Sequence, residues 1–337
     1  MIEVDGSYGS GGGQIVRTAA ALACITGKAV RIFNIRAKRP RPGLMPQHLF
    51  GIRALAELCG GSLEGDRPGS TEVKFYPGNE FKKSVEVSIP TAGSVGLVLQ
   101  TLFLPSSIRG SKIRIKGGAT FGRFAPPIPY IQLVLLPLLG RFGFGAEVRV
   151  ERHGFYPKGG AEVEVTVEKW SPEPADILER GSLNGIKVVS VASSSLQGVA
   201  DRQVEGSRKL LEKLGRVSSE CEYPESLCPG SGIVVVGDYE NSVLGSDALG
   251  EPGKRAEIVG REAAEMFLRF HESGAALDRH AADQVIPFLA LSGGRVSVAE
   301  ITNHCLTNIW VTEKFLGAKF EIKGSKGKPG EIAAKNF

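Results

Sequence analysis

One histidine stands out among the residues of this chain that could do chemistry. His304 lies in the stretch Ile-Thr-Asn-His-Cys-Leu-Thr-Asn at 301–308, among short polar residues where an amphipathic helix is predicted to begin. No partner with metal-ligand spacing lies nearby in the sequence. Main-chain amides at a helix start favour anions, and a neutral imidazole is a good nucleophile toward phosphorus. The segment therefore indicates either a nucleophile or, more simply, a histidine that caps the helix or packs against it.

A glycine-rich segment leads into the first predicted helix. Residues 6–13 read Gly-Ser-Tyr-Gly-Ser-Gly-Gly-Gly, and the helix begins at Gln14. Such a loop can adopt left-handed conformations and bring backbone amides close to a phosphate. It lacks the Lys-Ser/Thr pair of a Walker loop, and it is not the GxGxxG turn of a dinucleotide-binding fold. A tight turn from strand to helix explains the segment equally well.

Arginines follow this loop closely. Arg17 lies one turn into the first helix, and the run at 36–43 contains Arg36, Arg39 and two prolines that exclude a helix interior. We expect this run to be a loop that leads into a helix carrying Gln47. Arginine forks bind phosphate oxygens in a bidentate manner, and a solvated basic loop is also consistent with the run.

Two further helix starts carry polar side chains. Residues 89–96 repeat the pattern of a glycine loop before a helix, and Gln100 follows on that helix. Residues 278–284 begin another predicted helix, with Asp283 and Gln284 near its start. These side chains could read a nucleoside, and a helix N-terminal cap is an equally simple account of the segment.

The elements that must position these residues recur along the chain. At residues 14–35, 94–115 and 281–298, a helical apolar period changes to an alternating one just after glycine. Each segment is followed by a second helix, a glycine and further strand. The pattern predicts three repeated β-α-β-α-β-β units packed around shared sheets, within the α/β (α+β) class.

A segment that does not follow the repeat pattern separates the second unit from the third. The proline-containing stretch at 170–174 marks its beginning. The segment is predicted to contain strands at 186–191 and 232–236 and helices at 200–214 and 256–270. We therefore expect a large catalytic domain of three repeats at 1–180 and 276–337, and a small inserted α/β domain at 181–275. An insertion that leaves and returns at neighbouring points keeps the host fold intact.

Composition and charge exclude several classes of protein. The chain has 337 residues, of which 42% are hydrophobic and 23% charged, and a formal net charge of +5. Because no apolar run reaches membrane-spanning length and the first residues lack a signal-peptide pattern, we expect a cytoplasmic protein without membrane association. Five cysteines without a CxxC spacing argue against zinc and against a disulfide framework. The modest positive charge permits an anionic substrate such as a nucleotide or an RNA end.

Taken together, these segments resemble the RNA 3′-terminal phosphate cyclase family. The matching segments run in family order through nearly the whole chain, at 5–17, 35–49, 89–101, 117–127, 152–163, 282–284 and 303–316. The resemblance implies the fold shared with enolpyruvyl transferases, with a small inserted α/β domain. It also implies an enzyme that uses ATP and a divalent metal, Mg²⁺ or Mn²⁺. That enzyme would convert an RNA 3′-phosphate to a 2′,3′-cyclic phosphate and release AMP and pyrophosphate.

The resemblance implies roles for individual residues as well. His304 would attack the α-phosphorus of ATP and form a histidine–AMP phosphoramidate, from which AMP passes to the RNA end. Because a protonated imidazole could not attack, its surroundings must keep His304 neutral near pH 7. Phosphates of ATP and of the RNA end would be held by Arg17, Arg36, Arg39 and Gln47. The nucleotide pocket would be formed by Gln100, His280, Ala281, Ala282, Asp283 and Gln284, with His280 beside the adenine.

Three positions depart from the family pattern. Ser10 stands where family members carry the Glu of GEGGGQ, which leaves the metal ligands open; Asp5 or the ATP phosphates are the alternatives. His280 stands where some members have Tyr, and Ala119-Thr120 stands where Thr-Asp is usual.

Two other functions stay open at this point. A non-catalytic relative acting in ribosome assembly would only bind RNA or protein; Ser10 favours this alternative, whereas His304 and most of the arginines oppose it. An enolpyruvyl transferase would share the fold but not the helix start at 303–308. The sequence gives no indication of the oligomeric state.

Overall fold

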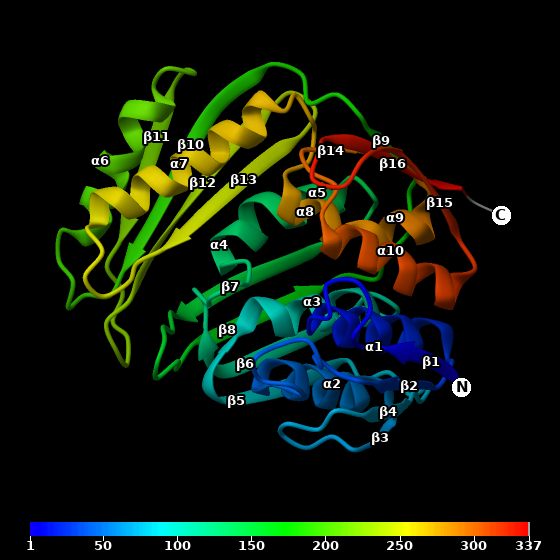
Figure 1. Cartoon of the computed structure of the whole chain (residues 1–337). Coiled ribbons are helices and arrows are strands. Elements are labelled where there is room, and N and C mark those ends of the chain that lie inside the picture. Colours follow the sequence, from blue (N-terminus) through cyan, green and yellow to red (C-terminus); the bar gives the residue numbers. More distant parts are fainter. Residues whose placement is uncertain (336–337) are drawn as a thin grey trace.

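Three four-stranded sheets with one common strand order form the larger part of the molecule (Figure 1). The computed structural model of the chain describes residues 1–335. The first sheet has the order β1-β2-β4-β3 and consists of β1 (Ile2–Asp5), β2 (Val30–Phe33), β3 (Ser62–Glu64) and β4 (Val73–Tyr76). Its unit also contains the helices α1 (Gln14–Thr26) and α2 (Pro46–Cys59). This is one β-α-β-α-β-β unit.

The second unit repeats the first. Its sheet has the order β5-β6-β8-β7 and consists of β5 (Ser84–Ser94), β6 (Ser111–Ala119), β7 (Ala146–Arg152) and β8 (Glu162–Val167). Helix α3 (Val95–Ser106) connects the first two strands. The second helical segment is divided into α4 (Ile128–Tyr130), the π-helical turn η1 (Ile131–Leu135) and α5 (Leu136–Gly140). A single helix was expected there, but Pro137 has no N–H with which to continue the α-helical hydrogen-bond pattern.

The third unit completes the set. Its sheet, with the order β9-β14-β16-β15, consists of β9 (Ala175–Ile177), β14 (Gly294–Val298), β15 (Lys319–Gly324) and β16 (Gly330–Lys335). In all three sheets the first two strands are parallel and the other neighbours are antiparallel. The helices are α8 (Arg279–Gln284), α9 (Ile286–Ser292) and α10 (Asn303–Leu316). The predicted three-unit fold is therefore confirmed, although the helix expected to begin at 278–284 breaks at Val285, just before Pro287.

Local sequence explains most of these elements. Along β6, Ile113 and Ile115 are buried while Lys112 and Arg114 are exposed, because successive side chains of a strand point to opposite faces. Helix α1 ends at Gly27, whose φ of 64° is left-handed, and its N–H bonds back to the carbonyl of Ala23. The same glycine ending closes α2 and α10. These are the positions where the apolar period changes in the sequence.

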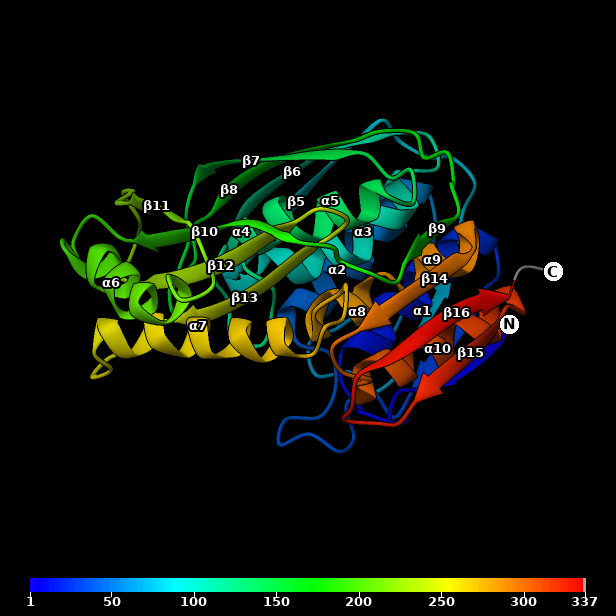
Figure 2. The same cartoon turned by 90° about the horizontal axis from the view of Figure 1, so that it is seen from above.

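A fourth sheet belongs to the segment between the second and third units (Figure 1). Its order is β11-β10-β12-β13, and its strands are β10 (Leu183–Ala192), β11 (Val217–Glu222), β12 (Ser231–Tyr239) and β13 (Val243–Leu249). Helices α6 (Val199–Leu211) and α7 (Ala256–Glu272) contact each other beside this sheet, and α7 runs along it in Figure 2. Strands β11 and β13 were not predicted. The first reads Val-Ser-Ser-Glu-Cys-Glu and has no apolar alternation.

Both faces of the inserted sheet are buried. One face, with Val188 and Val235, forms a hydrophobic core with α6 and α7 that is separate from the main one. The other face, with Val189 and Val234, packs into the main core of the three units. The domain boundaries at 181–275 stay a prediction. Within residues 1–335, no helix is both long and apolar enough to cross a membrane.

Candidate active site

His304 lies at the exposed start of α10. The N-cap of this helix is Thr302, whose side-chain oxygen accepts a hydrogen bond from the Cys305 N–H at 3.0 Å. His304 is therefore not needed as a cap, and it is exposed rather than packed in the core. A β-carbon placed on Gly12 would lie 3.6 Å from His304 Cε1, so the ring faces the glycine-rich loop.

Gln14 holds this histidine at two points. Its Nε2 donates a hydrogen bond of 2.8 Å to the carbonyl oxygen of His304, and its Oε1 contacts the ring Nδ1. Because Nε2 is committed to the carbonyl, Oε1 must accept from a protonated Nδ1. The proton therefore lies on Nδ1, and the lone pair of Nε2 is available for attack. Gln14 is a positioning residue that the sequence analysis did not single out, although it begins the helix after the glycine loop.

The electrostatic surroundings keep His304 neutral. Desolvation within the site lowers the pKa of His304 to about 4, and the positive charges of Arg17 and Arg39 act in the same direction. Burial also lowers the pKa of Arg17, to about 10, with Asp283 opposing the shift, so this guanidinium still carries its charge at pH 7. The neutral imidazole required by the sequence analysis is thus present in a cationic site.

The glycines of the loop allow close packing against side chains. A β-carbon on Gly13 would lie only 1.8 Å from Nε2 of His48, a buried residue of α2. One on Gly12 would lie 3.2 Å from Arg39 Nη2. The loop is therefore both a strand-to-helix turn and a wall of the histidine site.

The Gly13→Ala variant is expected to lose about 1–3 kcal/mol of unfolding free energy, because the added methyl group must displace His48. Urea unfolding followed by circular dichroism measures the loss. Gly140→Ala is the matched control, because a β-carbon there meets no atom within 4 Å. Equal stability of the two variants would contradict the close packing of Gly13 against His48.

A large cleft opens on one side of His304. It has a volume of about 780 Å³ and lies between the repeated units and the inserted segment. Five of the predicted site residues line it together with His304: Arg17, Gln100, His280, Asp283 and Gln284. The opposite wall includes Asp247 of β13 and Met266 of α7. The structure thus brings most of the predicted nucleotide-binding residues to one place, from three units of the chain.

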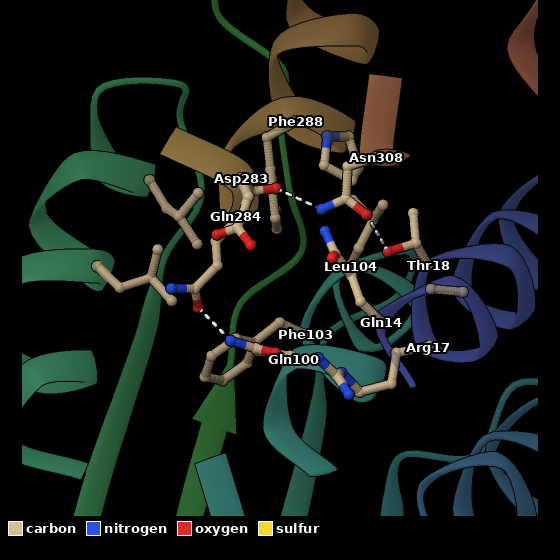
Figure 3. A pocket seen from close by; sticks show the side chains of 14 residues that line it. Gln14, Arg17, Thr18, Gln100, Phe103, Leu104, Asp283, Gln284, Phe288 and Asn308 are labelled. Carbon is tan, nitrogen blue, oxygen red and sulfur yellow. Dashed lines mark hydrogen bonds between the residues drawn. The ribbon is translucent and has the colours of Figure 1, made fainter. Parts of the chain in front are cut away.

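A small pocket behind this cleft contains a polar network (Figure 3). Gln100 Nε2 donates to Gln284 Oε1, and the Gln284 amide donates to the His280 carbonyl oxygen at 2.8 Å. Thr18 donates a 2.8 Å bond to Asn308, whose amide in turn donates to the carbonyl oxygen of Asp283. These bonds link the helices α1, α3, α8 and α10. They therefore fix the position of the cleft wall relative to the start of α10.

Three carboxyl groups lie near the cleft. Burial raises the pKa of Asp283 to about 7, with Arg17 acting against the shift, and burial also raises the pKa of Asp247 to about 7. Asp278 is fully buried and caps α8 through the N–H groups of His280 and Ala281. The predicted helix cap at 278–284 is therefore present, and the cleft is lined by four residues that follow it, namely Arg279, His280, Asp283 and Gln284.

A second hollow, here called the basic hollow, lies on another side of His304. It is lined by Ser10, Lys38, Arg39, Arg279, Glu300, Lys326 and the start of α10 at 301–304. Arg39 Nη2 donates to the carbonyl oxygen of Ser10 at 2.9 Å. His304, Thr302 and Arg279 line both this hollow and the cleft. The histidine thus stands in the wall between them.

The remaining predicted residues lie outside these two cavities. Ala281 and Ala282 are fully buried in α8. Arg36 has a left-handed φ of 55°, and its Nε is buried without a hydrogen-bond partner. The pKa of His48 is lowered mainly by burial, and the positive charges of Arg17 and Arg36 lower it further. Gln47 lies beside the loop at Gly93: a β-carbon placed on Gly93 would lie 3.6 Å from the Cβ of Gln47. The roles predicted for these four residues stay predictions.

The residues of the site do not fit a metal ion held by the protein. In the described part of the chain, no group of three or more His, Cys, Asp or Glu side chains could hold one. Asp5 accepts hydrogen bonds from Ser7 and Asn34 and does not line the basic hollow. Glu300, the one carboxylate of that hollow, forms an ion pair with Arg279, with 3.3 Å between Glu300 Oε2 and Arg279 Nη1. Of the alternatives left open by Ser10, the ATP phosphates agree best with this arrangement.

Fold and site together define a class of protein. Three repeated units and an insertion surround a nucleotide-sized cleft, and an accessible neutral histidine stands among arginines at its wall. Such a site is suited to nucleophilic attack on a phosphate.

Comparison with known proteins identifies the family. A family model described as RNA 3′-terminal phosphate cyclase matches residues 8–322. Proteins named RNA 3′-terminal phosphate cyclase are similar over almost their whole length. One from Thermococcus kodakarensis is 47% identical and covers 98% of this chain and 97% of its own. One from Saccharolobus solfataricus is 42% identical over 100% of both chains. The chain belongs to the RNA 3′-terminal phosphate cyclase family.

Among solved structures, the EPSP synthase from Acinetobacter baumannii aligns with 94% of this chain and 62% of its own. The identity is 14% and the TM-score 0.28, so the description of the fold depends on the repeated strand order instead.

Proposed function

We propose that this protein converts the 3′-terminal phosphate of an RNA to a 2′,3′-cyclic phosphate in an ATP-dependent reaction, through AMP bound covalently to His304. The relatives' names support the cyclisation of RNA ends. The observation that carries the proposed mechanism is the pair of contacts between Gln14 and His304, which leave Nε2 free beside the cleft. The RNA substrate and a cytoplasmic location are part of the proposal.

In the first step, His304 Nε2 attacks the α-phosphorus of ATP. The P–N bond forms while the bond to the β-phosphate oxygen breaks, and pyrophosphate leaves with the electron pair. The Nδ1 proton stays hydrogen-bonded to Gln14, which stabilises the positive charge that develops on the ring. Arg17 and Arg39 neutralise charge on the transferred group.

The next two steps activate and close the RNA end. An oxygen of the RNA 3′-phosphate attacks the same phosphorus, and the electron pair of the P–N bond returns to Nε2. The neighbouring 2′-hydroxyl then attacks the 3′-phosphorus and expels AMP, and its proton passes to the solvent. A phosphate monoester is a poor electrophile, whereas the adenylated phosphate has a good leaving group and a nucleophile already held next to it.

A direct test uses an oligonucleotide with a 3′-phosphate, ATP and MgCl₂. We expect a product that resists phosphatase, carries a 2′,3′-cyclic end, and forms together with one AMP and one pyrophosphate. An oligonucleotide with a 2′-deoxy terminal sugar is the control, because it can be adenylated but cannot close the ring. A non-catalytic member acting in ribosome assembly would bind the RNA and form no cyclic product.

The pH dependence of AMP transfer to His304 follows from its lowered pKa. Since protonation occurs at a pH of about 4, the nucleophile is neutral throughout the physiological range. The initial rate of covalent labelling should therefore show no titration of this ring between about pH 5.5 and 8, and should fall only in more acidic buffers.

The Gln14→Glu variant is expected to move this acid limb to higher pH, because a carboxylate beside Nδ1 stabilises the imidazolium form. Gln14→Leu is the control of similar size: it should lower the rate without moving the limb upward. Identical profiles for wild type and Gln14→Glu would show that Gln14 does not contact the reacting ring.

A further inference from the structure

The basic hollow beside His304 has more cationic side chains than its one carboxylate can neutralise. Lys38, Arg39, Arg279 and Lys326 converge on it from three segments of the chain. Glu300 is engaged with Arg279. Within residues 1–335, neither Lys38 nor Lys326 has an ion-pair partner. Unpaired cations gathered in a concave site indicate an anionic ligand.

The two lysines are held near the hollow by different parts of the fold. Lys38 lies along the glycine-rich loop, with its Cβ 3.6 Å from the position of a β-carbon on Gly11. Lys326 lies in the turn between β15 and β16, and this turn is bonded to the segment before α10. The Ile301 N–H donates to Lys328, and the Gly327 N–H donates back to Ile301, both at 2.9 Å. The lysines are thus tethered to the two segments that flank His304.

Ser10 adds an independent observation. Its hydroxyl oxygen is buried and has no hydrogen-bond partner, although the residue lines the basic hollow. A buried hydroxyl group without a partner is unfavourable unless a ligand completes its hydrogen bonds. A phosphate oxygen would accept from this hydroxyl directly. A carboxylate at the same position would repel a phosphate unless a metal ion lay between them.

We propose that the basic hollow binds the pyrophosphate half of ATP through Lys38, Arg39, Lys326 and the Ser10 hydroxyl, with lysine ammonium groups in the place of a metal ion held by the protein. The inference rests on the proposed function, in which ATP reacts at His304. This residue lies in the wall between the hollow and the cleft. A nucleotide whose α-phosphorus lies at His304 can place its nucleoside in the cleft and its β- and γ-phosphates in the hollow. The hollow then holds the leaving group of the first step.

The test measures binding of inorganic pyrophosphate by titration calorimetry in EDTA. The wild-type protein is expected to bind without any divalent metal. Lys38→Ala and Lys326→Ala should each weaken binding about tenfold, the loss of one charge-assisted hydrogen bond. Lys328→Ala is the matched control, because it lies in the same turn but does not line the hollow. Failure of the wild type to bind without metal, or equal binding by all three variants, would overturn the proposal.

The Ser10→Glu variant tests directly whether lysine ammonium groups take the place of a metal ion. In EDTA the new carboxylate should weaken pyrophosphate binding, and added Mg²⁺ should restore it, whereas the wild type should change little with Mg²⁺. Equal metal dependence of the two proteins would refute the inference. The titration uses pyrophosphate alone and involves no transfer of AMP to the protein, so failure of the histidine chemistry and failure of this site give different results.

Discussion

Replacement of His304 by alanine is expected to abolish the transfer of AMP to the protein, by a factor on the order of 10³ or more. The variant lacks the Nε2 lone pair that Gln14 leaves free in the wild-type protein. The wild-type protein, incubated with ATP labelled at the α-phosphate, should acquire label that is labile in acid and stable in alkali. The variant should acquire none.

His271→Gln provides the control for this experiment. His271 lies on α7, where its ring is hydrogen-bonded to Tyr239 and does not line the cleft. It should label like the wild type. Label on His304→Ala equal to that on the wild type would reject the proposed nucleophile, whatever the activity of the protein toward RNA.

Replacement of Asp278 by alanine is expected to cost about 3–5 kcal/mol of unfolding free energy. This fully buried carboxylate accepts from the Tyr130 hydroxyl at 2.8 Å, from the Gly245 N–H at 3.0 Å and from two N–H groups of α8. It therefore joins the second unit, the inserted segment and the third unit. Without it, four donors lose their acceptor at once, three of them in buried hydrogen bonds.

Urea unfolding curves measure this loss, with Asp238→Ala as the control. Asp238 lies at an exposed position of β12, and within residues 1–335 the one hydrogen bond to its carboxylate is a 3.3 Å bond from Asn184. Its removal should change stability by less than about 0.5 kcal/mol. A similar small effect at Asp278 would mean that the three parts of the chain are not joined through this carboxylate.

The repeated architecture could be predicted from the sequence because its signals are local. A strand such as β6 alternates buried isoleucines with exposed lysine and arginine, and a helix such as α1 ends at a left-handed glycine. Strand β11 has no such signal. It is paired with β10 and packs against α6, so tertiary contacts and not its own polar sequence make it a strand.

The candidate site was predicted in part, for the same physical reason. His304, Arg17 and Gln100 were singled out through short motifs and a family resemblance, and the structure brings them to one cleft. The role of Gln14 could not be predicted, because its partner His304 lies 290 residues away along the chain. Asp278 has the sequence of an ordinary helix cap. Its bonds to Tyr130 and Gly245 exist only once three segments have packed together.

The cleft takes side chains from each of the three repeats: Arg17 from the first, Gln100 from the second and His280 from the third. The nucleophile belongs to the third repeat and the glutamine that holds it belongs to the first, so no single repeat contains a complete site.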